Sequence, residues 1–251
     1  MIFEFPLSQN YRHFLRVEAT FVQIRKLLES ERNESLQAAL LLLQNFSDFL
    51  SRVDLKTEII KELEIQSGHY RRLQSNPEVD KVKLESFLAQ LRKLHHWAIN
   101  FSGKIGDSLK HDNFLGAVAS KQSLQTGIVS ADSPELAVFD FQPAEFKRNY
   151  LQKWLATLDG LEKSISVILR LTRELSAFTP SVAPLGDFMI DKVPTNTNLI
   201  RIKVDQAKIF PEVSASKHCA SIHFYSLDTN LRKLKFRDKI EFTVALCGWR
   251  V

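Results

Sequence analysis

The sequence predicts an α+β protein in which a helical bundle domain is joined to a small antiparallel β domain. Through the first two thirds of the chain, apolar residues recur every three or four positions, which is the spacing of amphipathic helices. After Thr179–Pro180, apolar and polar residues alternate instead, as they do in half-buried strands. The chain has 251 residues, 44% of them hydrophobic, so it can form a substantial core.

Two long helices are expected at the start of the chain. Ser8 is a suitable N-cap for the first, which runs to about Glu29 and carries a heptad-like apolar seam. Such a seam requires helical neighbours. Its residues are Phe14, Val17, Phe21, Ile24 and Leu28. The second helix covers about residues 33–52, and three residues widen its apolar stripe beyond one contact surface: Leu41, Leu42 and Phe49.

A third helix is predicted over about residues 54–74 and a fourth over about 80–101. Asn76–Pro77 separates them, because the residue before a proline disfavours the helical conformation. Four helices joined by short connections favour an up-and-down bundle.

The middle of the chain is expected to change from extended to helical structure. Residues 125–142 are predicted to be extended, and residues 143–178 form a long helical region with a break near Asp159–Gly160. Within this region, residues 161–175 are apolar on more than one side, so this segment should lie centrally.

The β domain is predicted from short segments in which apolar residues alternate with polar ones. We assign it residues 1–6 and 179–251 and assign residues 7–178 to the helical bundle, with 125–142 as an insertion that could join the β domain. The predicted strands are residues 199–204, 220–224 and 240–246, together with 2–5 at the N-terminus.

The sequence holds no motif that indicates an enzyme. Its eight glycines form no phosphate-binding loop, and no serine lies in a nucleophile elbow. We therefore expect no enzymatic activity, no cofactor and no small-molecule substrate. His218, Cys219 and His223 are close in sequence, but adjacent residues of an extended segment point to opposite faces. Because a fourth ligand is also not evident, no metal site is expected.

The lack of an export signal and of a long apolar run predicts a cytoplasmic protein that does not enter the membrane. Cys219 and Cys247 lack CxxC spacing and are expected to be reduced thiols that pack as small hydrophobic residues, the alternative being a disulfide between them. Residues 1–6 contain no basic leader, so no signal peptide is expected. The longest apolar run, residues 38–43, is far shorter than the ~20 residues that a membrane span requires.

The formal net charge is +5, and most of the excess lies in the C-terminal third. Residues 179–251 contain 11 Lys and Arg against 7 Asp and Glu, which suits an anionic partner. Within this part, Arg232–Lys239 alternates basic and apolar residues, with Lys217 and Arg201 as candidates to lie nearby. Nucleic-acid binding through this run is the alternative function, although the chain carries no known binding motif. The same pattern also protects edge strands from aggregation.

A second group of cations comes from the predicted helices. Arg12 and Arg16 lie four residues apart on the first helix, Arg52 ends the second and Lys56 begins the third. In an up-and-down bundle these positions meet at one end, where the strand at residues 2–5 also leads. The four cations either form a binding site beside the β domain or pair locally with carboxylates. The candidate carboxylates are Glu4, Glu18, Asp54 and Glu58.

Short segments spread over nearly the whole chain match one known family in a single register. They are Phe3–Leu7, Arg12–Glu18, Lys56–Leu63, Ser164–Phe178, Leu199–Ile202, Phe210–Ser214, Lys217 and Leu227–Thr229. On these segments the chain resembles the ZapD family of bacterial cell division factors.

The resemblance implies a homodimer formed through an α-helical domain, with a β domain beside it. It implies that the protein binds the C-terminal tail of FtsZ in a basic pocket, bundles FtsZ filaments, and promotes Z-ring assembly at mid-cell. Carried over position by position, the pocket residues are Arg12, Arg16, Arg52, Lys56, Lys217 and His223. The resemblance implies arginine at Cys219 and His223, so this wall of the pocket departs from the family pattern.

Overall fold

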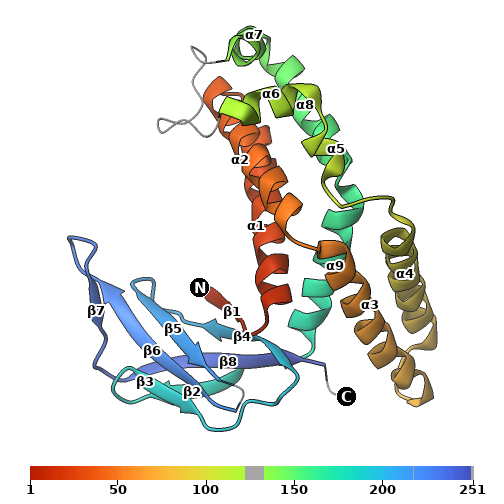
Figure 1. Cartoon of the computed structure of the whole chain (residues 1–251). Helices are drawn as coiled ribbons and strands as arrows, with labels where there is room; N and C mark the ends of the chain where they lie inside the picture. Colours follow the sequence, from red (N-terminus) through yellow and green to blue (C-terminus); the bar gives the residue numbers. More distant parts are fainter. Residues whose placement is uncertain (122–132, 217, 250–251) are drawn as a thin grey trace. The chain divides into compact units, whose positions relative to one another are not determined.

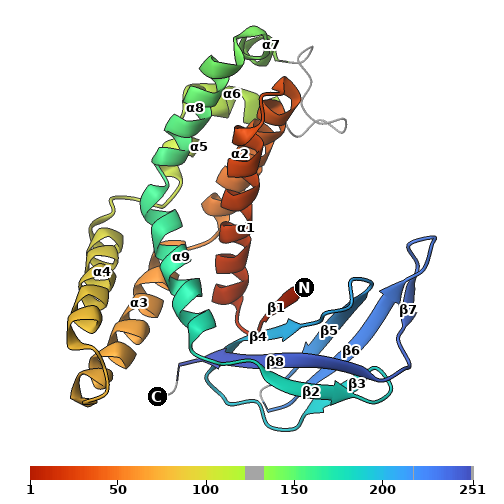
Figure 2. The same ribbon diagram turned by 180° about the vertical axis from the view of Figure 1, so that it is seen from behind.

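A computed structural model describes residues 1–121, 133–216 and 218–249 (Figures 1 and 2). The chain forms two compact units, one composed of residues 1–15 and 168–251 and the other of residues 16–167. The first unit contains the strands and the second is helical, so the predicted α+β class is confirmed. The predicted domain boundaries lie where helical sequence changes to strand sequence. The boundaries of the compact units lie instead within two helices, at residues 15/16 and 167/168.

The helices begin and end close to the predicted positions. The first four predicted helices are confirmed, and the expected break near residue 159 separates α8 from α9. The helices are α1 (Gln9–Glu29), α2 (Asn33–Arg52), α3 (Leu55–Arg72), α4 (Lys81–Asn100), α5 (Asp107–Lys110), α6 (Asn113–Lys121), α7 (Pro134–Phe141), α8 (Ala144–Ala156) and α9 (Asp159–Glu174), with a 3-10 turn at Leu73–Ser75.

Side-chain caps and apolar stripes explain why these helices form and how they pack. The Asp54 side chain accepts a hydrogen bond from the Thr57 amide at the start of α3, and Asp80 does the same for two amides at the start of α4. The helices α3 and α4 lie side by side in both views (Figures 1 and 2). The core face of α2 is buried at Leu36, Leu40, Leu43, Phe46 and Leu50.

The extended structure predicted for residues 125–142 is wrong where the structure describes the segment. Residues 134–141 form helix α7 of the helical unit, while residues 125–132 lie outside the described residues. The Ser133 side chain accepts a hydrogen bond from the Leu136 amide, and Pro134 occupies the first turn, where its missing N–H costs nothing. The apolar residues therefore follow a helical period, with Leu136 and Phe139 buried.

Gly160 in the first turn of α9 is required by close packing against Trp97 of α4. A Cβ atom at position 160 would lie 2.1 Å from Cε2 of the Trp97 ring. Gly160→Ala is therefore expected to lower the free energy of unfolding by ~1–3 kcal/mol, because the half-buried Trp97 indole must move away from α9.

The matched control for this change is Gly68→Ala in α3. Beyond its chain neighbours and its own helix backbone, no atom of the described residues lies within 4 Å of a Cβ built at Gly68, so alanine should raise stability by roughly 0.5–1 kcal/mol through its helix propensity. Denaturant unfolding of both variants measures the two effects, and equal changes at the two positions would contradict the packing argument.

The first unit contains two antiparallel sheets whose inner faces share one hydrophobic core. One sheet has the strand order β1-β4-β8-β2; in the other, β6 lies between β3 and β5 and also pairs with β7. The predicted strands near residues 2, 199, 220 and 240 are thereby confirmed. The strands are β1 (Ile2–Pro6), β2 (Thr179–Ala183), β3 (Asp187–Ile190), β4 (Thr197–Lys203), β5 (Ile209–Ala215), β6 (Ala220–Leu227), β7 (Lys233–Lys235) and β8 (Ile240–Gly248).

A half-buried ion cluster ties the N-terminal strand into this unit. Glu4 on β1 accepts hydrogen bonds from Arg173 Nε at 2.8 Å and from Arg201 Nε at 2.9 Å. The Arg201 guanidinium also lies 5.0 Å from the centroid of the Phe178 ring. The charge of Arg201, a candidate neighbour of the basic run Arg232–Lys239, is directed to Glu4 because β4 pairs with β1 in register.

Candidate functional site

A hollow in the helical unit brings together two of the predicted site residues. It has a volume of about 410 Å³ and is lined by Arg16 of α1 and Arg52 of α2. Apolar and polar side chains complete its wall: Thr20, Leu42, Asn45, Phe46, Asp48 and Phe49. The predicted meeting of the first helix with the end of the second is thus observed at Arg16 and Arg52.

The two guanidinium groups of this hollow are held differently. The Arg16 Cζ atom lies 5.2 Å from the centroid of the Phe49 ring, so this cation is positioned by an aromatic face. Arg52 Nη2 lies 2.7 Å from Asp48 Oδ2, one turn earlier on α2, and the Arg52 side chain is 73% exposed. Such an exposed ion pair contributes little to stability, so a carboxylate from a partner can replace Asp48 at low cost.

The other predicted helical cations are not part of this hollow's lining. Arg12 is exposed on α1 within the first unit. Lys56 is half-buried, and its Nζ donates a hydrogen bond of 2.7 Å to the Phe101 carbonyl. Lys56 therefore stabilises the chain segment after α4, a contact that the sequence does not reveal because it joins residues 45 positions apart.

On the β side, His223 is held by an acidic residue. His223 Nδ1 on β6 donates to Asp187 Oδ1 on β3 at 2.6 Å, and Lys235 Nζ on β7 donates to Asp187 Oδ2 at 2.8 Å. The hydrogen bond from His223, followed by that from Lys235, lowers the pKa of Asp187 below its ordinary value. The two contacts therefore favour folding above the ordinary pKa of Asp187 and weaken as pH falls.

The other predictions for the β unit concern Lys217 and the two cysteines. Lys217 lies outside the described residues. Cys247 is buried as expected, and burial raises the pKa of its thiol. Cys219 is exposed, so its predicted packing as a small hydrophobic residue is wrong; it directly precedes β6 and is not in the core.

The basic run Arg232–Lys239 includes β7, which pairs with β6 beyond the end of β3. Lys233 Nζ lies 2.5 Å from Glu212 Oε1 and 3.8 Å from the centroid of the Tyr225 ring. Lys235 and Lys239 contact Asp187 and Glu241, respectively. Because three cations of the run have carboxylate partners, the geometry favours a protected strand over a phosphate-binding surface.

Sequence reasoning missed the residues that give the hollow its shape. Phe49 was assigned to the widened apolar stripe of the second helix, and Asp48 was not considered as a partner of Arg52. The spacing of Phe46, Phe49 and Arg52 was the available signal, because residues three apart on a helix lie on neighbouring parts of one face.

The described residues contain neither a metal-ligating cluster nor a membrane-spanning helix. Within residues 1–121, 133–216 and 218–249, no group of three or more His, Cys, Asp or Glu side chains is arranged to hold a metal ion. In the same described residues, no helix combines the length and apolar character needed to cross a membrane.

Comparison with known proteins identifies the family. A family model described as "ZapD: Cell division protein" matches residues 15–223. The cell division protein ZapD of Aliivibrio fischeri is 32% identical, covering 98% of this chain and 97% of that protein. The ZapD protein of Cupriavidus taiwanensis is 27% identical, covering 99% of this chain and 100% of that protein. The ZapD protein of Pectobacterium carotovorum is also 27% identical, covering 98% of this chain and 97% of that protein. The chain therefore belongs to the ZapD family of cell division proteins.

Proposed function

We propose that this protein binds the C-terminal tail of FtsZ at the hollow formed by Arg16 and Arg52. By cross-linking FtsZ filaments in the cytoplasm, it promotes their bundling and the assembly of the Z-ring at mid-cell. Membership of the ZapD family supports the cell division role. The observation that carries the site is the convergence of two guanidinium groups and apolar side chains on one hollow.

The chemistry of the hollow suits a short peptide that mixes acidic and apolar residues. Two arginines against one carboxylate leave the lining with an excess positive charge for a peptide carboxylate. Arginine is suited to this role because its planar guanidinium can donate two parallel hydrogen bonds to a carboxylate. Leu42, Phe46 and Phe49 supply apolar contacts that salt does not screen.

Cross-linking requires at least two tail sites in one particle, so we propose that the protein acts as a homodimer. Leu41 of α2, which is 36% exposed and does not line the hollow, supports a helical interface between two copies. A single short peptide binds weakly in one exposed site. Two sites on a dimer and many tails on a filament raise the avidity by roughly 10²–10⁴ where their spacing permits simultaneous binding.

Co-sedimentation with FtsZ filaments tests the proposal. The protein should pellet with full-length FtsZ and increase filament bundling, and both effects should be lost with FtsZ that lacks its tail. Light scattering at micromolar concentration should give about twice the 28.8 kDa mass of the chain. Equal pelleting with and without the tail would contradict the tail site, and a monomer mass would contradict the bridging mechanism.

A further inference from the structure

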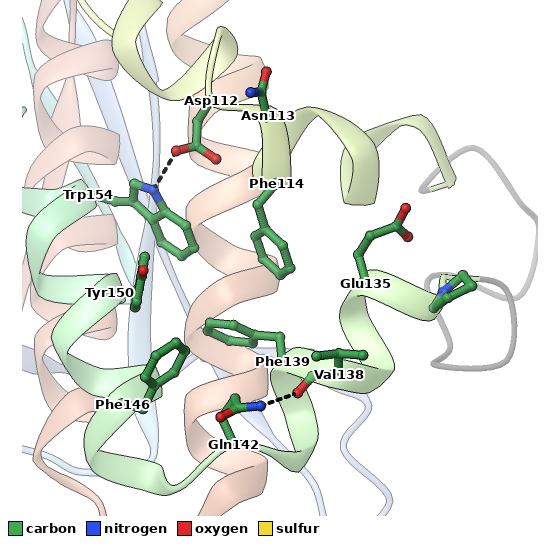
Figure 3. A pocket seen from close by; sticks show the side chains of 11 residues that line it. Asp112, Asn113, Phe114, Glu135, Val138, Phe139, Gln142, Phe146, Tyr150 and Trp154 are labelled. Carbon is green, nitrogen blue, oxygen red and sulfur yellow. Dashed lines mark hydrogen bonds between the residues drawn. The ribbon is translucent and has the colours of Figure 1, made fainter.

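A second pocket in the helical unit, lined by residues of α7, α8 and the start of α6, is rich in aromatic side chains (Figure 3). Its volume is about 810 Å³, which is within the usual range of ligand pockets. Five aromatic rings line it: Phe114, Phe139, Phe146, Tyr150 and Trp154. Because Arg16 and Arg52 are not among the lining residues, this pocket is separate from the proposed FtsZ-tail site.

The rings form a continuous set that holds one another in place. Phe114 stacks on Trp154 with centroids 5.7 Å apart and planes 10° from parallel, and Phe146 lies 4.8 Å from Tyr150. Phe146 and Tyr150 remain 40% and 41% exposed, so part of each residue is accessible to a partner. Tyr150 also has Lys153 Nζ 5.8 Å from its centroid, so a ring of this set already contacts a cation.

The charged side chains among the residues that line the pocket are acidic. Asp112 and Glu135 are among its lining residues, whereas none of the described residues that line it is lysine or arginine. Asp112 Oδ2 accepts a hydrogen bond of 3.0 Å from the Trp154 indole, and Glu135 Oε2 accepts one of 3.2 Å from Ser133 Oγ. A carboxylate offers about four acceptor sites, so each retains capacity for a further donor.

We propose that this pocket binds an arginine or lysine side chain presented by a partner polypeptide. Aromatic faces attract a cation through their quadrupole, and the two carboxylates complement its charge. A polypeptide fits better than a small organic cation because exposed apolar surface extends from the pocket along α7. Val138 of the lining is 63% exposed, Phe141 outside the lining is 91% exposed, and both can pack against apolar residues that flank the basic side chain.

Titration of the full-length protein with two synthetic peptides tests this inference. The probes are fluorescein-labelled Leu-Arg-Phe-Arg-Leu and the same peptide with citrulline in place of arginine, which keeps the shape but removes the charge. Fluorescence anisotropy should show binding of the arginine peptide at least tenfold tighter than binding of the citrulline peptide. Phe146→Leu keeps an apolar side chain but removes a π face, and should lower the affinity for the arginine peptide by roughly 2- to 30-fold.

Charge is tested with a matched pair of substitutions on neighbouring helices. Glu135→Gln in the pocket should weaken binding, whereas Glu145→Gln, an exposed residue of α8 outside the lining, should not. Equal affinity for the two peptides, or equal effects of the two glutamine variants, would overturn the proposal. The proposal would also be overturned if the protein bound neither peptide but self-associated, and if Phe146→Leu abolished that self-association. A second copy of this chain would then be the occupant of the pocket.

Discussion

Replacing Arg16 or Arg52 by glutamate is expected to abolish binding of an FtsZ tail peptide while helix content and thermal stability stay nearly unchanged. Both arginines are exposed, and the Arg52–Asp48 ion pair lies in solvent, so neither contributes much to folding. In the complex each guanidinium loses water and gains a carboxylate. Removing one partner of such a pair costs ~2–5 kcal/mol, or about 30- to 5,000-fold in affinity.

Peptide titration of the folded variants measures this effect. Arg92→Glu, an exposed residue of α4, is the matched control and should bind the peptide normally. Neutralising Lys233, Lys235 and Arg237 together should leave filament bundling largely intact. If the triple variant stops bundling while the Arg16 and Arg52 variants still bundle, the site lies on the β unit and the proposed hollow is wrong.

Replacing Glu4 by glutamine is expected to produce the largest loss of stability among exchanges of charged residues in the strand-rich unit. Glu4 is the shared carboxylate of Arg173 and Arg201, and the three side chains are only 18%, 23% and 15% exposed. Glutamine has nearly the same shape but no charge, so two half-buried guanidinium groups lose this counter-ion. We expect a decrease of ~3 kcal/mol in the free energy of unfolding. This value is near the lower end of the range of losses caused by removing one partner of a buried ion pair.

Denaturant unfolding at neutral pH measures the change. Glu241→Gln is the control, because Glu241 also lies in a strand of this sheet and pairs with Lys239, but both side chains are exposed, at 73% and 63%. Screening by water makes that pair weak, so its loss should not shift the transition measurably. Equal destabilisation by the two variants would show that the Glu4 cluster is no stronger than a surface pair.

The sequence by itself determined most of the secondary structure, because the period of its apolar residues is a local property. Helix α2 has the predicted bounds, and the alternation in residues 199–204 identified β4. Local signals could also mislead when two of them compete. In residues 134–141 the apolar pattern suggested an extended segment, while the Ser133–Pro134 cap favoured the helix that is observed.

The tertiary structure decided which charged residues meet. Arg16 and Arg52 were predicted to converge and do so, but the sequence could not show that Phe49 positions Arg16 or that Asp48 pairs with Arg52. Lys56 was predicted to join the same cluster of cations, yet its ammonium group donates a hydrogen bond to the Phe101 carbonyl. Glu4 was a candidate partner for the helical cations and instead holds Arg173 and Arg201. The sequence shows which residues are charged. Which residues they pair with depends on contacts between distant segments, and these form only when the chain packs.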